Sequence, residues 1–359
     1  MFGAFDAAEA AVRPLDEAAM AEARARQGRL SKPRGALGRL EELSVHLAGI
    51  AGACPPPVPS PAAVVVFAAD HGVVAEGVTP WPQEVTAQMV ANIVAGGAAI
   101  NVLARAAGAS VMVVDVGVAT PLPDACDGAP GFLSLPLGPG TANLAEEPAM
   151  DLATCRAALD VGAQLAQQFG GYGARALVTG EMGIGNSTSA ATLVAALTQR
   201  PAIEVTGRGA GVDDAGLIHK AAVVERALRR HSAAIVAGPL ETLAALGGFE
   251  IAALAGFVVG GAAAGVPVVI DGLIANAAVL AAEWLVPGVA AHCIAGHRSS
   301  EPGAAAVLED LNMEPVLDLD LRLGEGTGAC LALPILEAAA RVLTEMATFD
   351  AAGVTDKDA

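Results

Sequence analysis

The chain has 359 residues, of which 54% are hydrophobic, 16% are charged and only 3% are aromatic. Its formal net charge of -18 makes it a poor candidate for binding nucleic acid, whose phosphate backbone requires basic surfaces. The length suits one large domain or two ordinary ones, and the apolar content is sufficient for a large core.

The first fifty residues are mostly charged and of helix-forming types, and they predict two helices interrupted near residues 31–35. They contain no basic stretch followed by an apolar one, so they do not indicate a signal peptide. The next segment, CPPPVPSP at residues 54–61, is typical of a stiff proline-rich linker and predicts a domain boundary.

Beyond this linker, four short apolar runs rich in β-branched residues end in an acidic residue near a glycine. The acids that end these runs are Asp70, Asp115, Glu181 and Asp271. Segments of helical composition, such as residues 86–109 and 150–174, lie between the runs. This alternation predicts an α/β fold in which helices cover both faces of a parallel sheet. Since the carboxyl ends of parallel strands lie at one edge, we expect the acids to meet there and form a site.

The loop after the first predicted strand contains His71 and, within TPWPQEV, Trp81 between two prolines. A histidine in such a turn is usually held by hydrogen bonds, although it can also bind a ligand. A tryptophan held between prolines can cover an aromatic ring, but packing on the core explains it about as well.

The glycine-rich turn GEMGIGNST, residues 180–188, follows a predicted strand and opens a helix. Gly183 and Gly185 leave backbone N–H groups accessible, and Asn186 is a residue type that begins helices. A helix N-terminus of this kind can bind a phosphate, although the turn lacks the lysine of a Walker A loop. A tight strand-to-helix turn without a ligand explains the same residues about equally well.

A second glycine string, at residues 205–214, precedes a predicted helix that reaches Lys220. No clear strand comes directly before it, so it does not fit a dinucleotide-binding fingerprint. Lys220 is the only lysine between Lys32 and Lys357. It fits a counter-charge for a phosphate and a solvated helix lysine equally well.

Residues 251–270 are uncharged and together have the length of a membrane span. They include several glycines and Pro267, and they end in VPVVI, which is typical of a buried strand. We therefore predict an apolar helix followed by an apolar strand, and no membrane span.

The polar loop HCIAGHRSSEPG contains His292 and His297, but no third ligand lies at a spacing suited to a metal. The Arg298 guanidinium and the Ser299 hydroxyl are better suited to contact a phosphate or carboxylate. The five cysteines form no C-x-x-C pair, which predicts reduced thiols in a cytoplasmic protein.

In LRLGEGTGA, Glu325 lies between Gly324 and Gly326, just before a predicted helix. These glycines allow unusual backbone conformations and leave the carboxylate without side-chain neighbours in sequence. Glu325 fits either a helix-start acid favoured by the macrodipole or a catalytic base.

The helix after Glu325 is expected to be interrupted or kinked near Pro334. We expect residues 1–54 and 331–359 to pack together as a small helical domain. Residues 55–330 would then form the large α/β domain.

These motifs occur together in an order that resembles the nicotinate-nucleotide–dimethylbenzimidazole phosphoribosyltransferase family, from about Lys32 to Phe349. Its members make the lower-ligand nucleotide of cobalamin. The resemblance implies that nicotinate mononucleotide and 5,6-dimethylbenzimidazole are converted to α-ribazole 5′-phosphate and nicotinate, with inversion at the anomeric carbon. It also implies a Rossmann-like sheet with a small helical domain, a homodimer, and no metal or cofactor.

The resemblance also implies roles for individual residues. Glu325 would be the general base that takes a proton from the attacking base, and Glu181 would lie close to the reacting ribose. The expected substrate-binding residues are Trp81, Met89, Glu181, Gly183, Gly185, Asn186, Lys220, Asp271, Ser299 and Leu323.

Two other functions stay open at this stage. A non-catalytic nucleotide sensor on the same fold would gain nothing from the Glu325 charge facing an apolar base. An NAD-dependent dehydrogenase would need a G-x-G-x-x-G turn after the first strand, where the chain has ADHGV instead.

Overall fold

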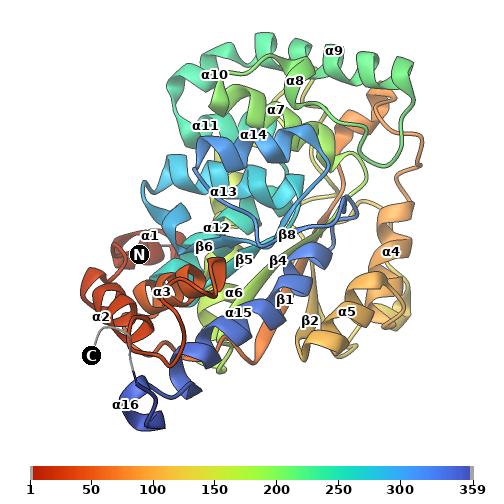
Figure 1. Ribbon diagram of the computed structural model, residues 1–359. Helices are drawn as coiled ribbons and strands as arrows, with labels where there is room; N and C mark the ends of the chain where they lie inside the picture. The colour runs from red at the N-terminus through yellow and green to blue at the C-terminus, as the bar shows by residue number, and fades with distance from the viewer. Residues whose placement is uncertain (1–2, 356–359) are drawn as a thin grey trace.

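The computed structural model of the protein describes residues 3–355, which fold around one six-stranded parallel sheet. The strands lie in the order β3-β2-β1-β4-β5-β6, so the direction in which the sheet grows reverses between β1 and β4. Figure 1 labels β2, β1, β4, β5 and β6 in this order. Their bounds are β1 Ala62–Ala69, β2 Ser110–Gly117, β3 Phe132–Ser134, β4 Ala176–Met182, β5 Val268–Ile270 and β6 Cys293–Ala295. The predicted parallel sheet is confirmed, and its order places a crevice beyond the carboxyl ends of β1 and β4.

Strand β1 is buried along its whole length because helices cover both faces of the sheet. Its side chains alternate, so that Val65 and Phe67 join the core on one face while Val64 and Val66 join the core on the other. The helices on the first face are α1 Ala4–Ala11, α6 Leu152–Gly171, α7 Asn186–Thr198, α11 Pro239–Leu246, α12 Phe249–Ala263, α13 Leu273–Leu285 and α14 Pro302–Asp310. Those on the second face are α3 Arg39–Ala51, α4 Val85–Val94, α5 Ala99–Ala107 and α15 Thr327–Glu345.

Smaller elements connect these layers. The other helices are α2 Glu17–Gln27, α8 Ala202–Val205, α9 Asp214–Arg230, α10 Ser232–Ala237 and α16 Phe349–Ala352. The 3-10 turns are η1 Gly72–Glu76, η2 Asp124–Cys126 and η3 Val289–His292, and β7 His297–Arg298 pairs in parallel with β8 Leu317–Asp318.

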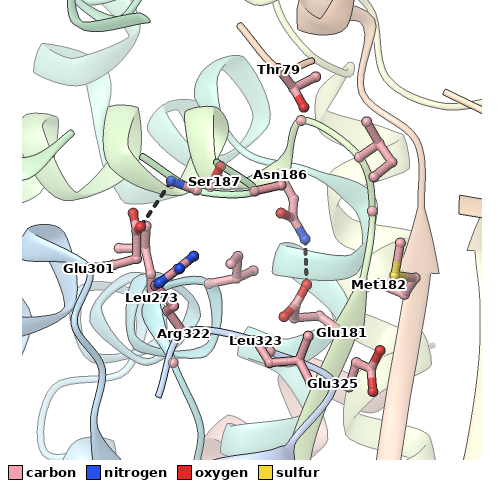
Figure 2. Close-up of a pocket in the computed structure, with 18 of the residues that line it drawn as sticks. Thr79, Glu181, Met182, Asn186, Ser187, Leu273, Glu301, Arg322, Leu323 and Glu325 are labelled. Atoms are coloured by element: carbon pink, nitrogen blue, oxygen red, sulfur yellow. Dashed lines mark hydrogen bonds between the residues drawn. The ribbon is translucent and has the colours of Figure 1, made fainter. Parts of the chain in front are cut away.

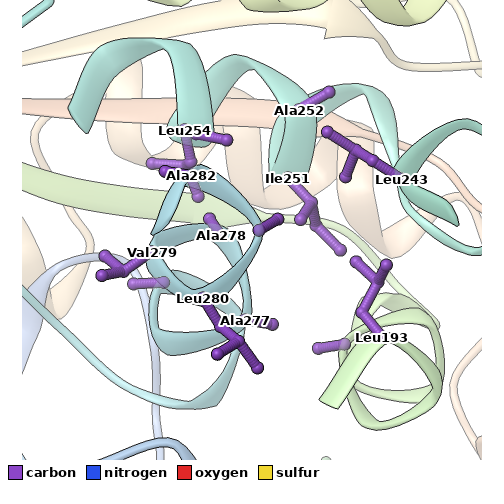
Figure 3. Packing of buried hydrophobic residues seen from close by; sticks show 14 of the residues in the cluster. Leu193, Leu243, Ile251, Ala252, Leu254, Ala277, Ala278, Val279, Leu280 and Ala282 are labelled. Atoms are coloured by element: carbon purple, nitrogen blue, oxygen red, sulfur yellow. The ribbon is translucent and has the colours of Figure 1, made fainter. Parts of the chain in front are cut away.

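Close helix packing fills a core that has few aromatic side chains. Helices α6 and α12 approach so closely that a Cβ atom at Gly162 would collide with the carbonyl oxygen of Ala253. Helix α12 also packs on α13, and Figure 3 shows buried residues of both helices, among them Leu254 and Ala282. Small and branched residues thus reach interior density by bringing the helix backbones together.

The apolar run at residues 251–270 is mostly helix α12 followed by strand β5, as predicted. Two other stretches are long and apolar enough to cross a membrane by length and composition alone, Val85–Ala107 and Thr327–Glu345. The first comprises α4 and α5, separated by residues 95–98, and the second is α15, which packs on α3 and α5. Core helices pass the same test, so these stretches are weak indications of a membrane span.

Helix α15 continues through Pro334, so the expected interruption there is wrong. Near its C-terminus it packs with α2 and α3. The buried residues at this contact are Ala23, Val45, Ala48 and Leu343.

The N-terminal segment contains three helices, where the sequence predicted two, and the predicted break near residues 31–35 falls between α2 and α3. The additional helix, α1, packs mainly on α6 and α12. The division of the chain into a small helical and a large α/β domain stays a prediction.

Candidate active site

A cavity of about 430 Å³ opens at the carboxyl edge of the sheet (Figure 2). Segments that follow β1, β4 and β5 line it, together with the segment before α15. Ten of the eleven residues predicted for the site line this cavity: Trp81, Met89, Glu181, Gly183, Gly185, Asn186, Lys220, Ser299, Leu323 and Glu325. The eleventh, Asp271, does not.

Glu325 lies at the centre of an unusual backbone segment. Gly324, Glu325 and Gly326 have φ angles of 91°, 62° and 90°, so three successive residues are left-handed. This region is uncommon for a residue with a side chain. The Glu325 residue is only 4% exposed, and within residues 3–355 its carboxylate accepts one long hydrogen bond, of 3.4 Å from the Ile100 N–H to Oε2. Burial, reinforced by the charge of Asp271, raises the pKa of Glu325 above that of a free glutamate.

Asp271, predicted to bind substrate, has its carboxylate bonded to backbone N–H groups, and the prediction itself stays untested. Its Oδ1 atom accepts hydrogen bonds from the N–H groups of Gly328 at 2.8 Å and Ala329 at 3.0 Å, and Oδ2 accepts from Gly326 at 3.2 Å. The carboxylate is therefore directed at the start of α15 instead of the cavity.

Two more strand-end acids also bind backbone instead of lining the cavity. Asp115 accepts hydrogen bonds from the N–H groups of Gly117 and Val118, and Asp70 accepts one from Ala119. The four strand-end acids do lie at one edge of the sheet, but of these four only Glu181 lines the cavity, together with Glu301 and Glu325 from later segments.

Glu181 lies at the end of β4, and the Asn186 side chain donates a hydrogen bond to its Oε2 atom, drawn as a dashed line in Figure 2. Burial raises the pKa of Glu181 to about 8, and the nearby charges of Asp271 and Glu250 act in the same direction.

Lys220 projects from α9 into the opposite side of the cavity and is only 1% exposed. Its Nζ donates a hydrogen bond of 2.9 Å to Ser187 Oγ in the first turn of α7. Burial lowers the pKa of Lys220 to about 8, although the Glu301 charge opposes this shift. A solvated helix lysine is thus excluded, and one cation, one hydroxyl and one helix N-terminus meet at this side.

The remaining wall of the cavity is apolar. It consists largely of Val78, Trp81, Val85, Met89, Met182 and Leu323. The Trp81 ring is half exposed, and its Nε1 donates a hydrogen bond of 3.0 Å to the Ala210 carbonyl, which belongs to the second glycine string. This geometry does not fit a core-packing tryptophan.

The histidines are engaged within the protein. His71 is buried between Ser189 Oγ at 3.0 Å and Glu250 Oε1 at 2.6 Å, as expected of a hydrogen-bonded turn residue. His292 bonds the Arg13 carbonyl, whereas His297 lies 3.3 Å from Asp271, so these two histidines serve different segments. Within residues 3–355, no three His, Cys, Asp or Glu side chains form a cluster suited to a metal, and the five cysteines are free.

A phosphoribosyltransferase family model matches residues 12–354. The nicotinate-nucleotide–dimethylbenzimidazole phosphoribosyltransferase of Salinispora tropica is 53% identical, covering 97% of this chain and 98% of its own. The enzyme of that name from Chloroflexus aurantiacus is 55% identical, covering 96% and 97%. A crystal structure of a protein of that name from Thermus thermophilus superposes with a TM-score of 0.89 at 49% identity, covering 95% of this chain and all of that one.

The chain belongs to the nicotinate-nucleotide–dimethylbenzimidazole phosphoribosyltransferase family. It is therefore a pentosyltransferase, and the dehydrogenase and sensor alternatives are not favoured. The Rossmann-like sheet expected from the resemblance is confirmed.

Sequence reasoning did not select several residues that line the cavity of this phosphoribosyltransferase. They include Thr79, Met182, Ser187, Leu273, Glu301 and Arg322. Each lies within three residues of a selected one, so extending every motif by a turn in both directions would have found them.

Proposed function

We propose that this phosphoribosyltransferase transfers the phosphoribosyl group of nicotinate mononucleotide to 5,6-dimethylbenzimidazole for assembly of the cobalamin nucleotide loop. The products are α-ribazole 5′-phosphate and nicotinate. The observation that carries the proposal is the buried Glu325 carboxylate, which lines a cavity together with a set of apolar side chains and the Lys220 cation.

In the proposed reaction, one ring nitrogen of dimethylbenzimidazole attacks the anomeric carbon opposite the departing pyridine nitrogen. A C–N bond forms as the other breaks, and the bonding electrons leave with nicotinate, so the β-nucleotide becomes an α-nucleotide. The other ring nitrogen gives its N–H proton to Glu325. The raised pKa of Glu325 strengthens the carboxylate as a base once it is ionised.

The 5′-phosphate binds between Lys220, Ser187 and the N-terminus of α7. A charged lysine attracts the anion, and the helix macrodipole and unpaired N–H groups add to this attraction. The hydrogen bond from Lys220 to Ser187 supports this arrangement because it fixes the ammonium group beside the helix start.

Glu181 lies close to the ribose in this arrangement. The pyridinium ring of nicotinate mononucleotide carries a positive charge, and an opposite charge nearby lowers the pKa of a carboxyl group. Binding of the nucleotide therefore favours the ionised form of Glu181. That carboxylate then stabilises the positive charge that develops on the ribose as the bond to nicotinate breaks.

The direct test is incubation of the purified protein with nicotinate mononucleotide and dimethylbenzimidazole, followed by separation of the products. We expect nicotinate and α-ribazole 5′-phosphate to form in equal amounts, and only when both substrates are present. Binding of both substrates without product would instead support a sensor and exclude the proposed transfer.

The proposal includes a homodimer located in the cytoplasm, with no metal or bound cofactor. The family resemblance supports the dimer. The five free cysteines support a reducing compartment.

Trp81→Ala is expected to weaken use of dimethylbenzimidazole more than binding of the nucleotide. Trp81 belongs to the apolar wall, and stacking on an aromatic ring contributes about 0.5–1.5 kcal/mol beyond area burial. A wall of this kind discriminates bases differing by a methyl group only modestly, by roughly 10–200-fold. Competition assays with mixed benzimidazoles would measure the base preference of each variant.

Trp284→Ala is the matched control, because Trp284 is 48% exposed against 49% for Trp81 but lies on α13 outside the cavity lining. It should preserve the base preference of the natural protein. If Trp81→Ala also preserves that preference, Trp81 does not select the base.

A further inference from the structure

Helix α15 begins without a capping side chain of its own. Its N-cap residue is Gly326, at a φ of 90°, which has no side chain to accept a hydrogen bond from the first turn. The first N–H groups of a helix need an acceptor from elsewhere. Asp271 supplies it across 55 residues of sequence, through its bonds to Gly326, Gly328 and Ala329.

The left-handed segment next to this helix start needs external support. A side-chain-bearing residue such as Glu325 in the left-handed region persists only where surrounding contacts determine its conformation. The Glu325 carboxylate accepts only a long hydrogen bond from Ile100, which is too weak to supply that support. Two contacts hold the backbone before the helix: the Thr327 hydroxyl donates a hydrogen bond of 2.8 Å to the Gly324 carbonyl, and the Glu181 carboxylate accepts one from the Glu325 N–H. The Asp271 bonds act on the Gly326 N–H directly after Glu325 and on the helix that follows.

His297 forms the other side of this arrangement. Its Nε2 lies 3.3 Å from Asp271 Oδ1, and its ring covers Gly328, where any Cβ atom would collide with it. The carboxylate is thus enclosed between one imidazole and three N–H groups, with 1% of the residue exposed. Asp271 is therefore bonded to the protein itself and does not line the cavity.

We propose that Asp271 is a positioning residue that holds the Gly324–Glu325–Gly326 backbone in its left-handed conformation and thereby directs the Glu325 carboxylate into the cavity. We call the hydrogen bonds from Gly326, Gly328 and Ala329 to Asp271 the clamp. Its purpose rests on the proposed role of Glu325 as the base. The clamp itself does not depend on that role.

The Asp271 charge has a second effect on the same carboxylate. Burial is the main cause of the raised pKa of Glu325, and the Asp271 charge raises this pKa further. The same charge also raises the pKa of Glu181. The other titratable or charged side chains that line the cavity around Glu325 are Glu181, Lys220, His297, Glu301 and Arg322. Removing the Asp271 charge therefore lowers the pKa of Glu325. In a plot of kcat against pH, kcat falls on the acidic side as Glu325 takes up a proton; we call this fall the acidic limb, and it should move to lower pH.

Asp271→Asn tests both effects with almost no change in side-chain volume. An amide has one oxygen where the carboxylate has two, so at least one of the three backbone bonds is lost. A misplacement of about 1 Å at a reacting group can cost about 10²-fold in rate, and we expect kcat to fall by about that factor. The KM values of both substrates should change by less than about threefold, since cavity-lining residues are untouched.

Hydrogen exchange followed by mass spectrometry tests the clamp without reference to activity. Peptides that contain Gly328 and Ala329 should be protected in the natural protein and should exchange faster in Asp271→Asn. Asp115→Asn is the matched control, because Asp115 also binds two backbone N–H groups at this edge of the sheet but lies outside the cavity lining. It should leave exchange near Gly328, kcat and the acidic limb unchanged.

The possible outcomes separate the two proposals. The positioning role is overturned if Asp271→Asn has the kcat of the natural protein and its acidic limb does not move. It is also overturned if the Gly328 and Ala329 amides are unprotected in the natural protein. If exchange accelerates in Asp271→Asn but Glu325→Gln stays fully active, the clamp exists and the base assignment fails.

A second variant covers the case in which Asp271→Asn does not fold. Gly326→Ala keeps the Asp271 charge but places a Cβ at a φ of 90°, 3.1 Å from the Thr179 carbonyl oxygen. It should lower kcat without moving the acidic limb. Natural-type kcat in this variant would show that the left-handed conformation is not needed and would overturn the proposal.

Discussion

Glu325→Gln is expected to lower kcat by about 10²–10⁴-fold, the usual contribution of a general base, while binding of both substrates survives. Glutamine keeps the size of the side chain and its place in the left-handed segment but cannot take up the proton. Steady-state kinetics would measure the loss of turnover, and titration calorimetry would measure the two affinities.

The pH dependence gives an independent signature of the same residue. The base must be ionised to act, so the rate should rise with pH through the pKa of Glu325. Burial raises that pKa, so this limb should lie above the ordinary glutamate value of about 4.3. The residual activity of Glu325→Gln should lack the limb.

A suitable control is Glu9→Gln, which makes the same chemical change at an exposed position on α1. It should leave kcat unchanged. A Glu325→Gln enzyme within about threefold of natural kcat would remove Glu325 from the role of base.

Lys220→Ala is expected to weaken binding of nicotinate mononucleotide by roughly 1.5–3 kcal/mol, the usual contribution of a charge-assisted hydrogen bond. This corresponds to about 10–150-fold in affinity. Binding of dimethylbenzimidazole should hardly change, because the proposed wall for that base is apolar and does not include Lys220. Titration calorimetry with each substrate would separate the two effects.

Because the pKa of Lys220 is lowered, the affinity for nicotinate mononucleotide should also depend on pH. The ammonium group is charged below about pH 8 and loses its proton above it, so affinity for the nucleotide should fall as the pH rises through that value. Lys220→Ala should lack this dependence. Arg229→Ala removes a charge from an exposed position of the same helix and should leave nucleotide affinity intact. Equal nucleotide affinities of Lys220→Ala and the natural protein would contradict the assignment.

Much of this protein follows from local sequence. Apolar β-branched runs such as VVVFAA at residues 64–69 predict buried strands because only a sheet covered on both faces hides every side chain of the run. The helical segments between them then require parallel pairing. The glycine-rich motifs at the strand ends locate the site, since all carboxyl ends of a parallel sheet meet at one edge.

The sequence could not show which strand-end acids face a ligand. Glu181 and Asp271 have similar surroundings in sequence, each at the end of an apolar run and close to a glycine. Their roles differ because α15 begins beside Asp271 and offers it three N–H groups, whereas Glu181 opens onto the cavity. That difference depends on residues more than fifty positions away.

Tertiary structure likewise decided the state of Lys220 and Glu325. Local sequence permits a solvated lysine in α9, but packing of α9 on α7 buries its ammonium group beside Ser187. The two glycines around Glu325 predict only a permissive backbone. A carboxylate becomes a base with a raised pKa when distant segments exclude water from it, and burial is a property of the assembled fold, not of the residues next to it in the chain.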